Sequence, residues 1–353
     1  MTDLKHRFEA FVKLGTFLKS FCDGIININK TTTDSSALSL EFKECISQAK
    51  HYNGWFTEEN ILFCLNNWAD ALTKENLEEW LTPYNLNNRE PKNVALIMAG
   101  NIPLVGFHDF LVTLITGHNA IIKLSSNDKT LLPFIAKILL ELEPSLKNNI
   151  LFTEERLENY DAVIATGSTN TARYFEHYFS KKPNIIRKSR NSVAVLTGEE
   201  TKEQLKALGE DIFRYYGLGC RSVSKLFVPK GYNFDAFFEA IYNFNPIINQ
   251  NKYANNYDYN KAVYLMSEYK LLENGFLMLK EDERNASPIA SVFYEFYENT
   301  NSLKKKLEEN KKNLQCIVAS NFVENEVPFG KTQLPTLNDF ADNVDTIKFL
   351  ISL

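Results

Sequence analysis

The sequence predicts an α/β protein: a doubly wound parallel sheet, a second α/β unit after it and a helical N-terminal segment before it. Three observations support this fold class. Short runs of Val, Ile, Leu and Ala alternate with amphipathic stretches from residue 94 onward, the pattern of a parallel sheet with helices on both faces. Glycine or a capping residue stands at the junctions between these runs. The first 90 residues have helical periodicity instead.

Residues 1–90 are expected to form the N-terminal helical segment. Apolar positions recur at helical spacing in FEAFVKLGTFLKSF, and Thr57 precedes two glutamates as the expected cap of the helix that contains NILFCLNNWADAL. The polar run TTTDSS at 31–36 is typical of a loop. Residues 80–91 contain Asn and Pro, which favours a linker and a domain boundary there.

Residues 91–205 are expected to form the first α/β domain. Its predicted strands are VALIMAG (94–100), NAIIKL (119–124), DAVIATG (161–167) and SVAVLTG (192–198). Its predicted helices are PLVGFHDFLVTLI (103–115), opened by proline, SSNDKTLLPFIAKILLEL (125–142) and STNTARYFEHYF (168–179), begun by Ser168 or Thr169. Ligands of such a sheet bind beyond the carboxyl ends of its strands.

Residues 206–325 are expected to form the second α/β domain, and 326–353 a C-terminal segment. The amphipathic helix TKEQLKALGEDIFRYYG leads into it, and KLFVP, SPIASVFYEFY and CIVAS are its clearest strand-like runs. The charged run 301–313 is typical of a solvated helix face. The ending VDTIKFLISL is apolar to its last residue. We therefore predict a C-terminal strand that adds to a sheet within the chain or across a homodimer.

Composition excludes several function classes. The chain has 353 residues, 44% hydrophobic and 24% charged, with a net charge of −5 and interspersed acids and bases. It has no basic face of the kind that binds nucleic acid. The start does not resemble a signal peptide, and no run is apolar enough to span a membrane. We expect a cytoplasmic protein with no nucleic-acid partner.

The cysteines and histidines do not predict a metal site. The five cysteines lack CxxC spacing and the five histidines form no HxxxH or HExxH pair. We therefore expect no metal and no disulfide framework.

Three strand ends carry candidate ligand-binding residues. Gly167 and Ser168 join a strand to a helix, which suits either a phosphate or ordinary turn chemistry; GxGxxG and P-loop motifs are absent from the sequence. Asn101 follows the first strand and is either an oxyanion donor or a helix cap. Lys123 ends the second strand and precedes Ser125 and Ser126, so it either pairs with a phosphate or is a solvated lysine.

The stretch GLGCRSVSKLFV contains the candidate nucleophile. Cys220 has Gly217 and Gly219 before it and Arg221 after it. Glycines permit a tight bend that exposes the sulfur, and a neighbouring cation favours the thiolate. The other four cysteines lie within helical or strand periodicity, as buried cysteines usually do. Cys220 is therefore the cysteine we expect at a loop junction.

These segments together resemble the aldehyde dehydrogenase superfamily, and more closely its LuxC-like acyl-CoA reductases. GLGCRSVSKLFV is similar to the nucleophile segment, AGNIPL to the oxyanion loop, GHNAIIKLSS and ATGST to the cofactor segments. NIPLVGFHDFLVTLITGHNAIIKLSS and the ending FGKTQLPTLNDFADNVDTIKFLISL carry the closer resemblance, which covers about 90–353. It implies that 91–205 is an NADP-binding domain and 206–325 a catalytic domain.

The resemblance also implies residue roles. Cys220 would be the nucleophile and Asn101 a side-chain donor of the oxyanion hole. Lys123 and Ser125 would contact the adenosine ribose or its 2'-phosphate, and Gly167 with Ser168 would lie near the pyrophosphate.

Two departures from the superfamily pattern refine the expected reaction. Ser126 stands where the superfamily has an acid, which removes a repulsion against a 2'-phosphate and favours NADPH over NADH. Ile186 or Arg187 stands where hydrolytic members carry a glutamate base, which disfavours hydrolysis of an acyl-enzyme.

The expected function is NADPH-dependent reduction of a fatty acyl-CoA to the aldehyde through a Cys220 thioester, with release of coenzyme A. The alternatives are an acyl-phosphate reductase or another acylating aldehyde dehydrogenase of the same fold. A non-enzymatic alternative is a cofactor-binding scaffold protein in which Cys220 is structural.

Overall fold

The computed structural model describes residues 3–26, 36–86 and 90–353. The chain forms two compact units, residues 1–188 with 336–353 and residues 189–335. The expected boundary at 205/206 thus lies at 188/189, because strand β6 (Asn191–Val195) belongs to the sheet of the second unit. The sequence alone places this run, SVAVLTG, in the first domain. A buried apolar strand carries no signal of which sheet it joins.

The first unit contains a five-stranded parallel sheet with the order β3-β2-β1-β4-β5. Its strands are β1 (Asn93–Ile97), β2 (Asn119–Lys123), β3 (Ile150–Phe152), β4 (Ala162–Thr166) and β5 (Asn184–Arg187). The central residues of β1 and β4 are buried, as expected when both faces are covered. The predicted α/β fold class with a parallel sheet is therefore confirmed.

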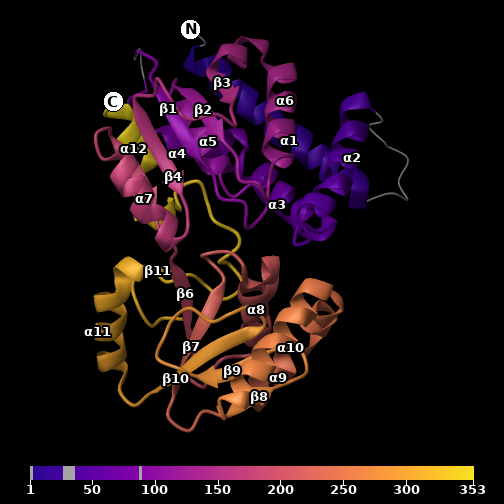
Figure 1. Ribbon diagram of the computed structural model, residues 1–353, viewed down its shortest axis with the longest axis vertical. Helices are drawn as coiled ribbons and strands as arrows, with labels where there is room; N and C mark the ends of the chain where they lie inside the picture. The colour runs from indigo at the N-terminus through magenta and orange to yellow at the C-terminus, as the bar shows by residue number, and fades with distance from the viewer. Residues whose placement is uncertain (1–2, 27–35, 87–89) are drawn as a thin grey trace. The chain divides into compact units, whose positions relative to one another are not determined.

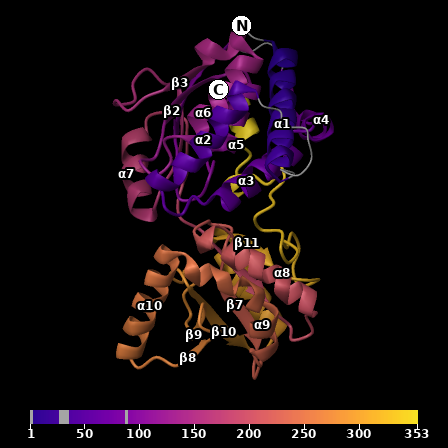
Figure 2. The ribbon, with the colours of Figure 1, turned by 90° about the vertical axis from the view of Figure 1, so that its right-hand side faces the viewer.

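Helices cover both faces of this sheet. The helices of the first unit are α1 (Leu4–Ile26), α2 (Ala37–Tyr52), α3 (Glu58–Ala71), α4 (Lys74–Leu81), α5 (Phe107–Ile115), α6 (Leu131–Leu142), α7 (Thr169–Phe179) and α12 (Thr346–Ile351). Phe175 and Phe179 of α7 pack on Ala95, Val163 and Ala165. Within this unit, α7 lies on one side of the sheet and α1 and α6 lie on the other (Figure 2).

The N-terminal helices belong to the first unit. Helix α1 contacts α3, α5 and α6, and α2 contacts α6. As predicted, Thr57 caps α3, its hydroxyl accepting the backbone N–H of Asn60 at 3.4 Å. Of the expected polar loop at 31–36, only Ser36 lies within the described residues, where it caps α2.

Two helices begin later than predicted. Helix α5 begins at Phe107, because residues 101–106 form a loop in which Leu104 has a left-handed backbone (φ 53°). Helix α6 begins at Leu131, whose N–H is accepted by Asp128 at 3.3 Å. In both cases the residue expected at the start, Pro103 or Ser125, lies in the loop that precedes the helix.

The predicted C-terminal strand is wrong, because residues 346–351 form helix α12. Asp345 caps it by accepting the N–H of Lys348 at 2.9 Å. Ile347 and Leu350 lie three residues apart on one helix face and are buried, and α12 packs against α5. A homodimer paired through a C-terminal strand therefore has no basis in this fold.

The second unit contains a six-stranded sheet with the order β11-β6-β7-β10-β9-β8. Besides β6, its strands are β7 (Val223–Pro229), β8 (Leu271–Glu273), β9 (Met278–Glu281), β10 (Ser291–Tyr297) and β11 (Leu314–Val318). Only β8 is antiparallel to its neighbour among these described strands.

Each face of the second sheet has its own helical layer. Figure 1 shows α11 (Thr300–Asn310) on one face and α8 (Lys202–Phe213), α9 (Asp235–Ala240) and α10 (Asn251–Met266) on the other. Leu205, Leu208 and Phe237 pack in the core beneath α8 and α9. Leu303 and Leu307 of α11 pack with Phe227 on the opposite face.

Candidate active site

The carboxyl ends of β1, β2 and β4 bring together the candidate residues of the first unit. These three strands are neighbours in a parallel sheet, so the loops that follow them lie along the same edge. The chain turns from β1 toward β2 and later returns to place β4 on the other side of β1. This reversal of strand order is the place where doubly wound sheets bind ligands.

The loop after β1 carries Asn101 at an exposed position. The side-chain amide of Asn53 donates to the Gly100 carbonyl at 3.3 Å, and the Cys64 thiol donates to the Pro103 carbonyl at 3.3 Å. Asn101 does not cap α5, because Gly106 occupies the cap position. The capping alternative for Asn101 is therefore excluded. The hydrogen bonds to Gly100 and Pro103 hold the loop on either side of Asn101.

The loop after β2 lies against the loop after β1. A Cβ at Gly100 would lie 2.8 Å from both Cβ and Oγ of Ser125, so only glycine permits this approach. The ammonium group of Lys123 donates to the Glu155 carbonyl at 3.0 Å, and Ser125 Oγ accepts the Asn127 N–H at 3.2 Å. Ser126 is exposed.

Asp128 in this loop was not identified from the sequence. Its side chain is buried and accepts backbone N–H groups of Leu131, Leu104 and Thr130, so it joins the loops after β1 and β2. Burial raises the pKa of Asp128 to about 6, and these hydrogen bonds oppose the shift. An aspartate three residues before an apolar helix is the signal that could have indicated that its carboxylate accepts the first N–H of the helix.

The junction between β4 and α7 has the predicted turn. Ser168 Oγ accepts the Thr171 N–H at 3.2 Å, and the Gly167 N–H donates to the Arg187 carbonyl at 3.2 Å. A Cβ at Gly167 would lie 3.1 Å from the Phe175 ring, tighter than most real contacts. The positive end of the α7 dipole therefore lies at the same sheet edge as Lys123.

In the second unit, Cys220 is exposed in the loop between α8 and β7. Cys22, Cys64 and Cys316 are buried and Cys45 is half-buried. Burial raises the pKa of the Cys22 and Cys45 thiols to about 11. Cys220 is therefore the most accessible thiol of the five, at a loop junction as the sequence predicted.

The backbone leading to Cys220 is strained. Tyr215 (φ 55°), Tyr216 (φ 58°) and Gly217 (φ 73°) are consecutive left-handed residues. Such a conformation costs about 1–3 kcal/mol for each non-glycine residue and is often found at functional sites. The Cys220 carbonyl accepts the hydroxyl of Ser192 at 2.9 Å, which fixes the end of the bend.

Asp211 and Thr332 support this loop and were missed by the sequence reasoning. Asp211 is fully buried in the last turn of α8 and accepts the N–H and the hydroxyl of Thr332, at 2.9 and 2.8 Å. The available signal was a carboxylate on the apolar face of a helix, between Leu208 and Ile212.

The segment around Ile186 and Arg187 does not supply a base. Arg187 is buried and forms a two-pronged ion pair with Asp109, with 2.9 Å between Nη2 and Oδ1 and a second contact from Nη1 to Oδ2. It also donates to the Thr346 hydroxyl at 3.2 Å. Arg187 thus has a structural role in the first unit.

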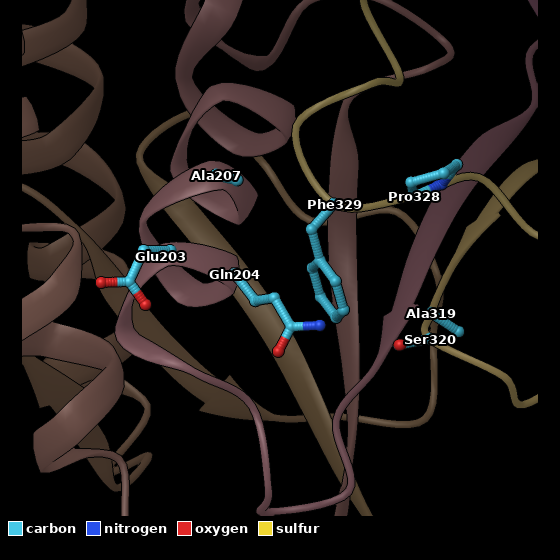
Figure 3. Close-up of a pocket in the computed structure, with 7 residues that line it drawn as sticks. All are labelled: Glu203, Gln204, Ala207, Ala319, Ser320, Pro328 and Phe329. Carbon is cyan, nitrogen blue, oxygen red and sulfur yellow. The ribbon is translucent and has the colours of Figure 1, made fainter.

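A separate hollow of about 280 Å³ lies in the second unit (Figure 3). It is lined by Glu203, Gln204, Ala207, Ala319, Ser320, Pro328 and Phe329. The lining belongs to the first turns of α8 and the residues after β11, whereas Cys220 follows the other end of α8. The residues that line the hollow do not include Cys220.

The described residues contain neither a candidate metal site nor a candidate membrane-spanning helix. Within ranges 3–26, 36–86 and 90–353, no group of three or more His, Cys, Asp or Glu side chains could hold a metal ion. The helices in those ranges include none with the length and apolarity needed to cross a membrane.

Solved structures with this fold are aldehyde dehydrogenases. An indole-3-acetaldehyde dehydrogenase of P. syringae, in complex with NAD+ and IAA, has a TM-score of 0.65 at 12% identity, over 95% of this chain and 75% of its own. A Bacillus cereus aldehyde dehydrogenase in complex with NAD+ has 0.62 at 14%, over 92% and 72%. Aldehyde dehydrogenase 21 of Physcomitrella patens, in complex with succinate, has 0.64 at 13%, over 98% and 87%.

Sequence comparison identifies the family. None of the curated proteins matches the chain. The family model described as acyl-CoA reductase (LuxC) matches residues 33–240, more than half of the chain and including Asn101 and Cys220. With the aldehyde dehydrogenase fold and this match, the chain belongs to the LuxC acyl-CoA reductase family of oxidoreductases.

Proposed function

We propose that this protein reduces a fatty acyl-CoA to the aldehyde, with NADPH as the reductant and Cys220 as the covalent nucleophile. The observation that most directly supports this proposal is the exposure of Cys220 on a strained loop, in a chain whose other cysteines are buried or half-buried. Thioester exchange needs a thiol that the substrate can reach. Membership of an acyl-CoA reductase family supports the thioester as the substrate class.

The first step transfers the acyl group. The Cys220 thiolate attacks the thioester carbonyl carbon, and the bond from that carbon to the CoA sulfur breaks as the CoA thiolate leaves. The carboxamide of Asn101 donates a hydrogen bond to the oxyanion that forms in between. The exposure of Asn101 and the exclusion of its capping role support this assignment.

The carboxyl edge of the first sheet fits a nicotinamide dinucleotide. Gly167 lets the end of β4 lie close to Thr171 and Phe175 of α7. Ser168 opens this helix, whose dipole favours an anion, and Lys123 adds a positive charge. When bound, the reduced cofactor supplies the hydride that converts the acyl-enzyme to a hemithioacetal. Collapse of that hemithioacetal releases the aldehyde and regenerates the Cys220 thiolate.

The expected NADPH preference rests on Ser126. It is an exposed hydroxyl in the loop after β2, so it does not repel a 2'-phosphate. The nearby carboxylate of Glu154 is already paired with Lys129, at 2.5 Å between Nζ and Oε1. This pairing lowers the repulsion that Glu154 would otherwise exert on an anion.

The buried position of Arg187 supports reduction over hydrolysis. Strand β5, with the sequence NIIR, contains no carboxylate that could activate water, and the Asp109 carboxylate beside it is buried in the ion pair with Arg187. An acyl-enzyme without such a base persists until it is reduced or returned to CoA.

The test follows cofactor oxidation and acyl-enzyme mass. The protein is incubated with acyl-CoAs of graded chain length and NADPH, and in parallel without cofactor for intact mass spectrometry. We expect NADPH oxidation and a single acyl adduct, both lost in Cys220→Ala and both retained in the matched control Cys45→Ala. Turnover in Cys220→Ala would refute the assignment of the nucleophile.

A second panel separates the alternatives. Turnover of acyl phosphates in place of acyl-CoAs would identify an acyl-phosphate reductase. If brief treatment with a low dose of a thiol reagent labels Cys220 no faster than the other cysteines, and no substrate turns over, the scaffold interpretation is favoured.

A further inference from the structure

The segment 329–333, FGKTQ, contacts both flanks of the Cys220 loop. On the side before Cys220, Asp211 accepts three hydrogen bonds from it: the Gly330 N–H at 2.6 Å, the Thr332 N–H at 2.9 Å and the Thr332 hydroxyl at 2.8 Å. On the side after Cys220, Arg221 Nε donates to the Thr332 carbonyl at 2.5 Å. Thr332 is therefore bonded to residues on both sides of the candidate nucleophile.

Asp211 is a buried carboxylate whose hydrogen bonds come from the 329–333 segment. Its side chain is fully buried, and the contacts that stabilise its charge are the two N–H groups and the hydroxyl of the 329–333 segment. Burial raises the pKa of Asp211, and these three hydrogen bonds lower it. Burying a carboxylate costs free energy unless its oxygens accept hydrogen bonds, so Asp211 and the segment hold each other in place.

Two further contacts fix the position of this segment against α8 and against the residues after Cys220. Gly330 has φ 79°, and a Cβ there would lie 3.0 Å from Cβ of Ala207 in α8. The Gln333 amide donates to the Ser222 hydroxyl at 3.4 Å. Residues 212–220, which include the left-handed Tyr215 and Tyr216, therefore lie between Asp211 and Arg221, and both of these residues are hydrogen-bonded to the 329–333 segment.

We propose that Asp211 is a positioning residue: through Thr332 it holds the 329–333 segment, which sets the Cys220 loop in its reactive conformation. The expected effect of Asp211 on turnover rests on the proposed function. Its expected effect on the conformation of the Cys220 loop rests on the observed contacts alone. The 329–333 segment lies beyond residue 240, where the family match ends.

Paired substitutions isolate the hydrogen bonds. Thr332→Val removes the hydroxyl at nearly constant shape, whereas Thr332→Ser keeps it. Asp211→Asn replaces one acceptor oxygen with an NH₂ group that faces another donor. The matched control is Glu326→Gln, because Glu326 also accepts backbone N–H groups, those of Phe322 and Val323 at 2.9 and 3.0 Å and that of Asn321.

The first readout does not depend on activity. Hydrogen–deuterium exchange of the peptide that covers 214–222 should rise in Asp211→Asn and Thr332→Val, and should match the wild type in Thr332→Ser and Glu326→Gln. Equal exchange in all four variants overturns the proposal. If Asp211→Asn does not fold, the Thr332 pair decides the outcome alone.

The second readout measures turnover. A misplacement of about 1 Å can lower a rate by about 100-fold. We therefore expect kcat to fall by on the order of 10- to 100-fold in Thr332→Val, while KM for acyl-CoA stays within about twofold. Loss of binding with unchanged kcat would contradict a positioning role. If the wild type itself reduces no acyl-CoA, the proposed function fails, and the exchange experiment still decides whether the segment holds the loop.

Discussion

Arg187→Met tests the assignment of this residue to the structure of the first unit. Arg187 and Asp109 are both buried, with side-chain exposures of 7% and 10%, and the guanidinium also contacts Thr346. The substitution leaves the Asp109 carboxylate buried without its cation. Breaking one side of a buried pair costs about 3–5 kcal/mol, because the remaining charge has lost its compensation.

The double variant Arg187→Met with Asp109→Leu separates the charge effect from packing. Replacing both partners with apolar groups of similar volume is often neutral or stabilising. We therefore expect the double variant to recover most of the free energy of unfolding that Arg187→Met loses. The remaining loss would come from the Thr346 hydroxyl, which then lacks its donor.

Urea unfolding followed by tryptophan fluorescence suits this measurement. All three tryptophans of the chain, at positions 55, 68 and 80, belong to the first unit. The signal therefore reports the unit that contains the ion pair. The shift in midpoint multiplied by the m-value gives the change in free energy of unfolding.

Two results would refute the reasoning. A loss below about 1 kcal/mol in Arg187→Met would mean that Asp109 finds solvent or another partner. A double variant as unstable as the sum of the two single variants would mean that the pair contributes by packing and not through its charges.

Three other predictions concern the sheet edge of the first unit. Asn101→Ala should lower kcat by about 100- to 1,000-fold with little change in KM, as for the loss of one oxyanion donor; an unchanged kcat in steady-state assays would remove Asn101 from the mechanism. Ser126→Glu should shift the ratio of kcat/KM values from NADPH toward NADH, and a constant ratio would contradict the cofactor assignment. The pKa of Asp128 is raised to about 6 from an ordinary 3.8, so the folded state binds this proton more tightly: the stability it contributes is present below about pH 4 and is lost as pH rises through 6. Between about pH 5 and 7 the wild type should lose roughly 1 kcal/mol more than Asp128→Asn in urea unfolding; equal slopes would show that Asp128 titrates normally.

Local sequence signals predicted the elements that local physics controls. Ser168 and Thr57 cap the helices expected of them, because an N-cap depends on a hydroxyl and the backbone three residues on. The position of Cys220 in an exposed loop also followed from local pattern, since glycines flank it while the other cysteines lie in periodic segments.

The structure differs from the sequence predictions where contacts between distant residues outweigh local conformational preference. The ending TIKFLI is apolar enough for a strand, but Ile347 and Leu350 find a buried face against α5 only as a helix. Leu104 adopts a left-handed backbone that no local signal indicates, in a loop held through Asn53, Cys64 and Asp128.

The sequence by itself determined the α/β class, the order of the candidate residues and the place of Asn101, Lys123 and Gly167 at strand ends, because these depend on periodicity and turn chemistry. Only the tertiary structure decided which strands share a sheet, and that Asp211, 121 residues before Thr332, meets it beside the Cys220 loop. Such pairings form because a buried carboxylate is stable only when it accepts hydrogen bonds, and the tertiary structure determines which donors lie within reach. The spacing of residues along the chain does not indicate which donors these are.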